Sequence, residues 1–167
     1  MAIEPLTNEG WGFETNCFVC EERNERGLRV PFRHDTDRGV VLAELQLADH
    51  FSGAPTWVHG GVVLAVLDEA MAWAAIALRH RWAVTKESQA WFDRPVLVDR
   101  RYRVEATVVD GAEDLLTTEA SVMSVDTGKV SVRTRATMSV VTAVQAPGLG
   151  IDLDASGTGY LAGGDAG

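Results

Sequence analysis

An acidic residue inside a long apolar segment is the first candidate for chemistry in this chain. Asp68 lies in the middle of GGVVLAVLDEAMAWAAIAL, the segment from Gly60 to Leu78, which is long enough for one helix. A carboxylate in such surroundings can activate water or attack an electrophilic carbon directly. Gly60 and Gly61 open the segment, and their backbone N–H groups lie at the positive end of the helix dipole, where they can stabilise an oxyanion. Together these groups supply what hydrolysis at an acyl carbonyl requires.

The two components are too far apart to act together within one helix. Eight residues separate Gly60 from Asp68, which corresponds to about 12 Å along a helix. If two chains pair with their helices antiparallel, Gly60 of one chain approaches Asp68 of the other. A complete site then requires a dimer and occurs twice in it.

The helix itself must be covered, because its apolar residues occupy every side of the helical wheel. A membrane is one environment for such a helix, since its length approaches that of a membrane span. However, Asp68 and Glu69 lie at its centre, and each charge there would cost about 2.5–3.5 kcal/mol. We therefore reject the membrane and expect an α+β fold, in which a curved antiparallel sheet wraps around one long central helix.

Strand-like segments lie on both sides of the helix. Alternation of apolar and polar residues predicts a hairpin before the helix and four strands after it. The predicted strands are 27–34, 39–47, 84–92, 101–109, 115–125 and 129–144. We expect an irregular lead-in at 1–26, a single domain at 27–144, and a disordered tail at 145–167, which has few large apolar residues.

Charge and composition argue against several other functions. The 167 residues carry a net charge of −9, which disfavours binding to nucleic acids and to anionic membrane surfaces. No segment is typical of a secretory signal. The chain has only two cysteines, Cys17 and Cys20, too few for a disulfide-rich secreted domain. We therefore expect a cytoplasmic protein.

The two cysteines have the spacing of zinc ligands. A structural zinc site needs four ligands, and no second pair follows in the sequence. Only His34, His50 or another subunit would complete such a site. We therefore expect neither a metal nor another cofactor.

The segment VHGGVVLAVLDEAMAWAA resembles the helix signature of hotdog-fold thioesterases, in particular the phenylacetate-pathway (PaaI-like) acyl-CoA thioesterases. In that signature HGG is followed by an acidic residue nine positions after the histidine, which here is Asp68. The segment CFVC followed by Gly27–Leu28, and the segment from Phe92 to Pro95, also match this branch. The resemblance spans residues 17–144 and implies a hotdog fold that hydrolyses acyl-CoA thioesters.

The resemblance also implies roles for individual residues. Asp68 would be the general base or nucleophile, and the Gly60 amide would polarise the thioester carbonyl. His59 would order the glycine loop or contact the thioester, or would only cap the helix. Thr85 would hydrogen-bond to the acidic residue or the attacking water, or would be an ordinary strand threonine. Relatives often carry Asn or Gln in the loop before HGG, where this chain offers Ser52 as a weak substitute.

Three further residues are candidates for substrate binding. Gly61 offers a second backbone amide beside Gly60. Trp73 is a candidate floor for an acyl pocket, although a tryptophan on an enclosed helix is more often a core residue. Arg94 belongs to a group of arginines that either hold the phosphates of coenzyme A or balance acidic neighbours on a solvated face. That group comprises Arg79, Arg81, Arg94, Arg100, Arg101 and Arg103.

Several alternatives stay open at this stage. Glu69 points about 100° away from Asp68 on the helix, so an ion pair or an interface contact is expected for it. The thiol carrier of the substrate is coenzyme A or an acyl-carrier protein. A hotdog dehydratase or hydratase relies on a histidine and a carboxylate at a different spacing. A non-catalytic acyl-thioester-binding protein is consistent with the absent Asn or Gln. Our prediction is an acyl-CoA thioesterase that forms a homodimer or a dimer of dimers, with its sites at the subunit interface.

Overall fold

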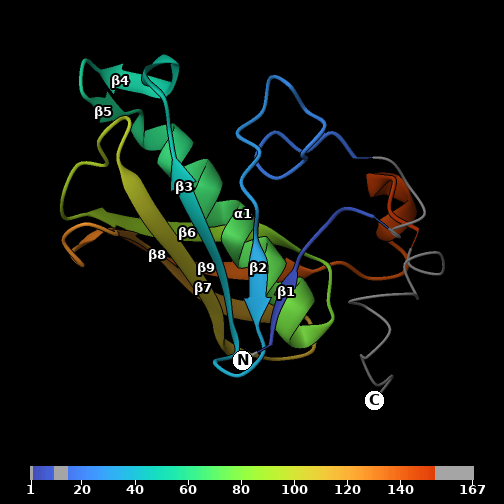
Figure 1. Ribbon diagram of the computed structural model, residues 1–167. Coiled ribbons are helices and arrows are strands. Elements are labelled where there is room, and N and C mark those ends of the chain that lie inside the picture. The colour runs from blue at the N-terminus through green and yellow to red at the C-terminus, as the bar shows by residue number, and fades with distance from the viewer. Residues whose placement is uncertain (1, 10–14, 153–167) are drawn as a thin grey trace.

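A seven-stranded antiparallel sheet curves around one long helix in the computed structural model, which describes residues 2–9 and 15–152. The order of the strands is β1-β2-β3-β7-β8-β9-β6, and every neighbouring pair is antiparallel. Figure 1 shows the helix lying along the concave face of the sheet. The expected α+β architecture is confirmed.

The bounds of the elements follow the chain. The strands of the main sheet are β1 (Ile3–Pro5), β2 (Arg33–Asp35), β3 (Val40–Gln46), β6 (Ala83–Phe92), β7 (Arg101–Gly111), β8 (Leu115–Ser124) and β9 (Val130–Val140). The other elements are η1 (Asp49–Phe51), β4 (Ser52–Ala54), β5 (Trp57–Val58), α1 (Gly60–Arg79) and η2 (Ala146–Leu149). The short strands β4 and β5 form a separate hairpin that leads directly into α1.

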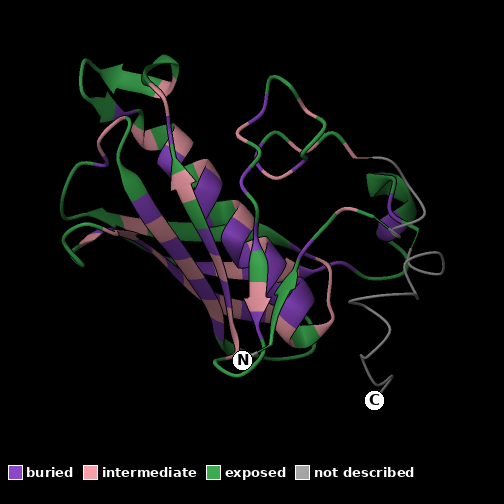
Figure 2. Cartoon of the chain, viewed as in Figure 1, coloured by how far each residue is buried: buried purple, intermediate pink, exposed green. Residues whose placement is uncertain are grey.

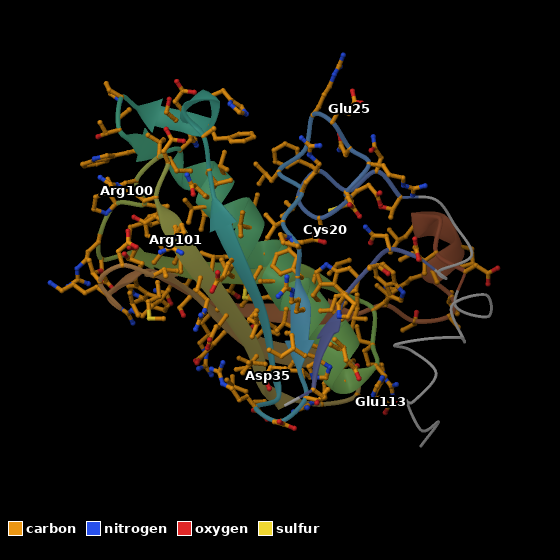
Figure 3. The ribbon with its side chains drawn as sticks, in the orientation of Figure 1. Cys20, Glu25, Asp35, Arg100, Arg101 and Glu113 are labelled. Carbon is orange, nitrogen blue, oxygen red and sulfur yellow. The ribbon has the colours of Figure 1, made fainter. Side chains whose placement is uncertain are left out.

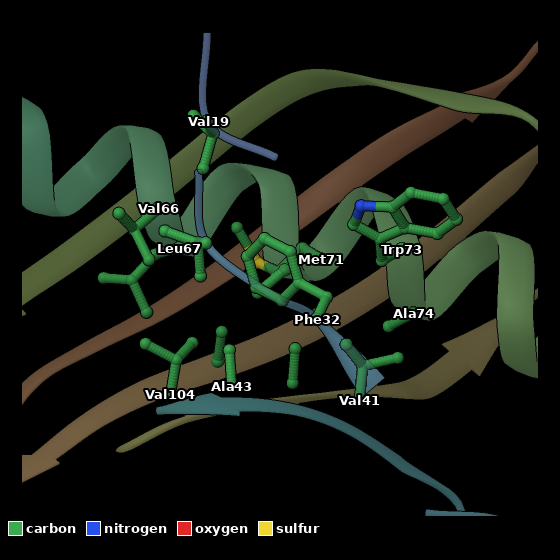
Figure 4. Close-up of a cluster of buried hydrophobic side chains, with 14 of the residues drawn as sticks. Val19, Phe32, Val41, Ala43, Val66, Leu67, Met71, Trp73, Ala74 and Val104 are labelled. Carbon is green, nitrogen blue, oxygen red and sulfur yellow. The ribbon is translucent and has the colours of Figure 1, made fainter. Parts of the chain in front are cut away.

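The core lies between α1 and the concave face of the sheet. Strands β7, β8 and β9 alternate buried and more exposed residues, so that every second side chain faces the helix (Figure 2). Phe32, Leu67, Met71 and Val104 are among the fully buried side chains, and Figure 4 shows this part of the core. Truncating a side chain such as Met71 to alanine here would cost about 2–5 kcal/mol. This packing holds the helix rigidly against the sheet.

The helix is buried unevenly along its length, which corrects the expectation that it is covered on all sides. From Ala70 to Ala77 all but one residue are buried, whereas the first half exposes a stripe made of Gly61, Leu64 and Asp68. These residues recur at helical spacing and so share one face. By length and hydropathy α1 would pass as a membrane span, but 56% of that window is buried inside the protein. It is therefore the core helix of a soluble type of fold.

One predicted strand is mostly wrong. The prediction placed a strand at 27–34, whereas β2 covers only Arg33–Asp35. The preceding residues pair elsewhere, because the amides of Leu28 and Val30 donate to the carbonyls of Phe18 and Val19. Residues 28–30 therefore pair with the N-terminal segment and not with a strand of the main sheet.

Regular elements lie in the described parts of the segments expected to be an irregular lead-in and a disordered tail. Within the predicted lead-in at 1–26, strand β1 pairs with β2 and extends the sheet. Within the predicted tail at 145–167, η2 forms, and Ala146 and Ile151 are buried in a small cluster with Val141 and Trp82. Residues 1, 10–14 and 153–167 lie outside the described part of the chain.

Candidate active site

The β4–β5 hairpin and His59 set the start of helix α1. The amide of His59 donates to the carbonyl of Phe51, and His59 Nδ1 accepts a hydrogen bond of 2.9 Å from the Gly61 amide. Gly53 packs so closely that a Cβ there would lie 3.0 Å from the Cα of His59. His59 is therefore the N-cap of the helix and orders the glycine loop. Exposed Ser52 lies in the same hairpin, next to this loop.

Gly60 retains a free amide at the positive end of the helix. The His59 side chain already occupies the Gly61 amide, so Gly61 is not available as a second donor. Within residues 2–9 and 15–152, the Gly60 N–H has no hydrogen-bond partner. A Cβ at Gly60 would lie 3.6 Å from the ring of Phe92, so the end of β6 borders this amide. The helix start thus offers one oriented donor to an anionic or polarised oxygen.

Asp68 is held by a residue of the neighbouring strand. Thr85 Oγ1, on β6, donates a hydrogen bond of 2.5 Å to Asp68 Oδ1. This is the contact that the resemblance implied for Thr85. We expected Asp68 to be enclosed by apolar neighbours, but in the single subunit its side chain is exposed, because it lies on the open stripe of α1.

The enclosed carboxylate is instead Glu69, which sequence reasoning expected in an ion pair or at an interface. Glu69 lies beside Cys17 and Cys20, and burial together with the neighbouring Cys17 raises the pKa of Glu69 to about 7. The hydrogen bond from Cys20 lowers the pKa of the Cys17 thiol to about 5, and Cys17 in turn raises the pKa of Cys20. The spacing of these three residues along the chain carried no signal of this contact.

Strand β6 is one of the two edges of the main sheet, and its Thr85 contacts Asp68. Most of its side chains are exposed, including the large apolar Val84, Trp91 and Phe92 at 47%, 37% and 51%. A ten-residue edge strand with unpaired backbone groups is a template for pairing with another strand. Asp68 therefore lies where the exposed edge of the sheet meets the exposed stripe of α1.

The remaining candidates are dispersed. Trp73 is a core residue with 3% exposure, as Figure 4 shows, and it does not border the open stripe. Arg94, just beyond β6, is exposed and donates to the carbonyl of Val130 at 2.8 Å. Arg79 ends α1, so the helix separates it from Gly60 by about 30 Å.

Two other arginines of the predicted cluster also have local partners. Arg101 and Arg103 pair with Asp126 and Glu44, and Figure 3 shows Arg100 and Arg101 together at one end of β7. For these two arginines the balance of acidic neighbours on a solvated strand face describes the structure better than a phosphate site. A hollow on the face of the sheet opposite α1 is lined by Trp91, Glu119 and Arg133, and none of the predicted site residues borders it.

A model of the thioesterase superfamily matches residues 57–131, which contain Gly60, Asp68 and Thr85. Among curated proteins no significant match is found.

Solved structures show the same fold at low sequence identity. Protein RHA08564, a thioesterase superfamily protein, has a TM-score of 0.65 at 23% identity over 71% of this chain, which covers 60% of that protein's length. The E. coli PaaI protein from the phenylacetic acid degradation operon has a TM-score of 0.58 at 16% identity, over 62% of this chain and 74% of PaaI. The smu.793 protein from Streptococcus mutans, bound to acetyl CoA, has a TM-score of 0.58 at 16% identity, over 62% and 82%. At these identities the three likenesses show that the chain shares their fold.

Proposed function

We propose that this protein hydrolyses acyl-CoA thioesters to a free carboxylic acid and coenzyme A. The observation that carries the proposal is the pairing of Thr85 with Asp68 on an open surface that also offers the unpartnered Gly60 amide. The match of residues 57–131 to the thioesterase superfamily model supports thioester hydrolysis in the broad sense. Acetyl CoA in the S. mutans structure supports coenzyme A as the carrier of the acyl group.

The site is completed by a second copy of the chain. Two β6 strands pair antiparallel across a twofold axis, which joins two sheets into one and removes both free edges. The exposed stripes of the two α1 helices, with Leu64 between Gly60 and Asp68, then pack against each other. This pairing brings Gly60 of one subunit to Asp68 of the other and covers the carboxylate that a single subunit leaves exposed. Such dimers are free to pair again into tetramers.

The reaction divides into two roles within each shared site. The Gly60 amide donates a hydrogen bond to the carbonyl oxygen, which becomes an oxyanion when the carbon is attacked. Asp68 either takes a proton from the attacking water or attacks the carbon itself, and Thr85 holds the carboxylate in position. When Asp68 acts as base, the bond from the water oxygen to the carbon forms, the carbon–sulfur bond breaks, and the proton taken from water passes to the leaving thiolate. When Asp68 attacks, the carbon–sulfur bond breaks to leave a mixed anhydride on Asp68; water then cleaves this anhydride, which releases the acid and regenerates the carboxylate, and a proton from the water goes to the thiolate. Water is the only co-substrate, and a cytoplasmic location fits a coenzyme A substrate.

A panel of thioester substrates and one isosteric substitution test this function. Thiol release is measured with a thiol-reactive dye from short, long and aromatic acyl-CoA esters, and from acyl-carrier-protein thioesters. The parent should hydrolyse at least one class of ester, and Asp68→Asn should lose about 10² or more in rate. Asp114→Asn changes an exposed aspartate in a turn and serves as the control.

Three outcomes would count against the proposal. A parent that binds acyl-CoA tightly but releases no thiol would be an acyl-binding protein. Hydrolysis confined to acyl-carrier-protein esters would change the substrate class. Full activity in Asp68→Asn would remove the carboxylate from the mechanism.

A further inference from the structure

Three side chains with metal-binding atoms meet beside helix α1. Cys17 and Cys20 come from the N-terminal segment, and Glu69 comes from the middle of the helix. Their two sulfur atoms and one carboxylate oxygen all lie within 4.8 Å of one another. Ligand atoms around tetrahedral zinc are about 3.5–3.8 Å apart, given bonds of about 2.3 Å to sulfur and about 2.0–2.2 Å to oxygen. Small side-chain movements would therefore bring all three atoms onto one ion.

Both sulfur atoms accept hydrogen bonds, and Cys20 Sγ also donates to Asn8 Oδ1 at 3.9 Å. The amides of Val19 and Cys20 point at Cys17 Sγ, at 3.4 and 3.3 Å. Asn8 Nδ2 points at Cys20 Sγ at 3.4 Å and also donates to Glu21 Oε2 at 3.1 Å. Donors that orient the ligand atoms in this way are the usual outer shell of a metal site.

No salt bridge joins the cluster to a positive side chain among residues 2–9 and 15–152. Among the residues that the structure describes, Glu69 takes part in no salt bridge, although its side chain is largely withdrawn from solvent. Both cysteines are free. A disulfide between them would use the two sulfurs and leave the half-buried Glu69 carboxylate unpaired, whereas a cation would be bound by all three groups.

We propose that Cys17, Cys20 and Glu69 bind one thiol-preferring divalent cation of the zinc class, with water in the fourth position. The ion links the N-terminal segment to the middle of α1, at the residue next to Asp68. This differs from the expectation of no metal that the sequence supported. Neither His34 nor His50 joins the cluster, and the ligand that does, Glu69, lies far along the chain from the cysteine pair.

Metal binding is tested directly on the full chain. The protein is prepared with a reductant, freed of metal by a chelator, and dialysed against Zn²⁺ or Co²⁺ alone. The parent should bind one Zn²⁺ per chain, and Co²⁺ should produce the absorption bands of a tetrahedral thiolate complex. Glu69→Gln keeps the size of the side chain and should weaken Zn²⁺ binding at least about tenfold. Cys17→Ser should abolish the thiolate-to-cobalt band.

A matched control distinguishes the loss of this metal site from the loss of a negative charge elsewhere on the protein. Glu25→Gln changes an exposed glutamate on the same segment, visible above Cys20 in Figure 3, and should leave Zn²⁺ binding unchanged. Equal Zn²⁺ affinity in the parent and Glu69→Gln would overturn the proposal, as would less than one ion per chain. Both free thiols could instead be lost in air, at the same rate in the parent and in Glu69→Gln and whether or not Zn²⁺ is present. That result would indicate a disulfide in place of a metal site. Because the readout is metal content, it is independent of thioesterase activity.

Discussion

Replacing Gly60 by proline would remove one hydrogen-bond donor from the candidate site while leaving helix α1 in place. Proline lacks the amide hydrogen, and it is favoured at the first position of a helix, which Gly60 occupies. The preceding residue, His59, has φ −58° and ψ 130°, the backbone conformation that a residue before proline prefers. The nearest side chain, Phe92, leaves ordinary contact distance for an added Cβ.

The size of the effect follows from the partners of that amide. Because the Gly60 N–H has none in the described part of the chain, its removal breaks no internal hydrogen bond and should change stability little. If the amide stabilises the oxyanion, its loss should lower kcat by about 10²–10³, or about 2.7–4 kcal/mol in the barrier. Gly60→Ala retains the amide and should keep most of the activity.

The comparison of the two variants is the decisive assay. Thiol release is followed over a range of acyl-CoA concentrations, so that kcat and KM are separated, and dimer content and thermal unfolding are measured for each variant. A loss confined to kcat in Gly60→Pro supports the oxyanion role. A folded, dimeric Gly60→Pro enzyme with the kcat of Gly60→Ala would refute the reasoning.

Three further predictions follow from the geometry. Thr85→Val should lower kcat about tenfold or more while the protein stays a folded dimer. Thr85→Ser, which keeps the hydroxyl, should have a kcat close to that of the parent. Equal kcat values in Thr85→Val and Thr85→Ser would mean that the contact with Asp68 is only structural. Leu64→Glu places a charge on the exposed stripe of α1 and should convert the dimer into an inactive monomer, as measured by analytical ultracentrifugation. Val109→Glu is the control, because Val109 on β7 is an apolar residue of similar exposure, and this variant should stay dimeric. Glu21, whose pKa is lowered to about 2 mainly by the hydrogen bond from the Arg23 side chain, stabilises the fold above about pH 4.5, and this contribution is lost as the pH falls through about 2. Glu21→Gln should therefore unfold more readily than the parent at pH 7, with a difference in urea midpoint that shrinks towards pH 2.

The local features of the site could be predicted because they depend on neighbours in sequence. The helix from Gly60, its capping residue His59 and the spacing from the glycines to Asp68 follow from helical geometry and chain order. The strands after the helix were predicted to within a few residues, apart from an overlong last strand, because their alternation matches the two faces of the sheet. The partnership of Thr85 with Asp68 came from the resemblance and not from periodicity.

The exposure of Asp68 could not be predicted in the same way. The helical wheel is apolar on every side, so it does not reveal which face the sheet covers. The sheet curves over one side of the first half of α1 and leaves the side of Leu64 and Asp68 uncovered. That uncovered side is the surface on which we expect the second subunit.

The order of residues along the chain is enough to predict the apolar helix, the carboxylate within it, the glycine amides at its start and the alternating strands that must cover it, because each depends on residues at most a few turns apart. The folded arrangement was needed to show that Glu69 is more buried than Asp68, that it meets Cys17 and Cys20, and that β6 is left as an edge strand. These contacts join residues far apart in the chain. Their distances depend on how the sheet bends and which strands pair, and the periodicity of a single segment does not contain that information.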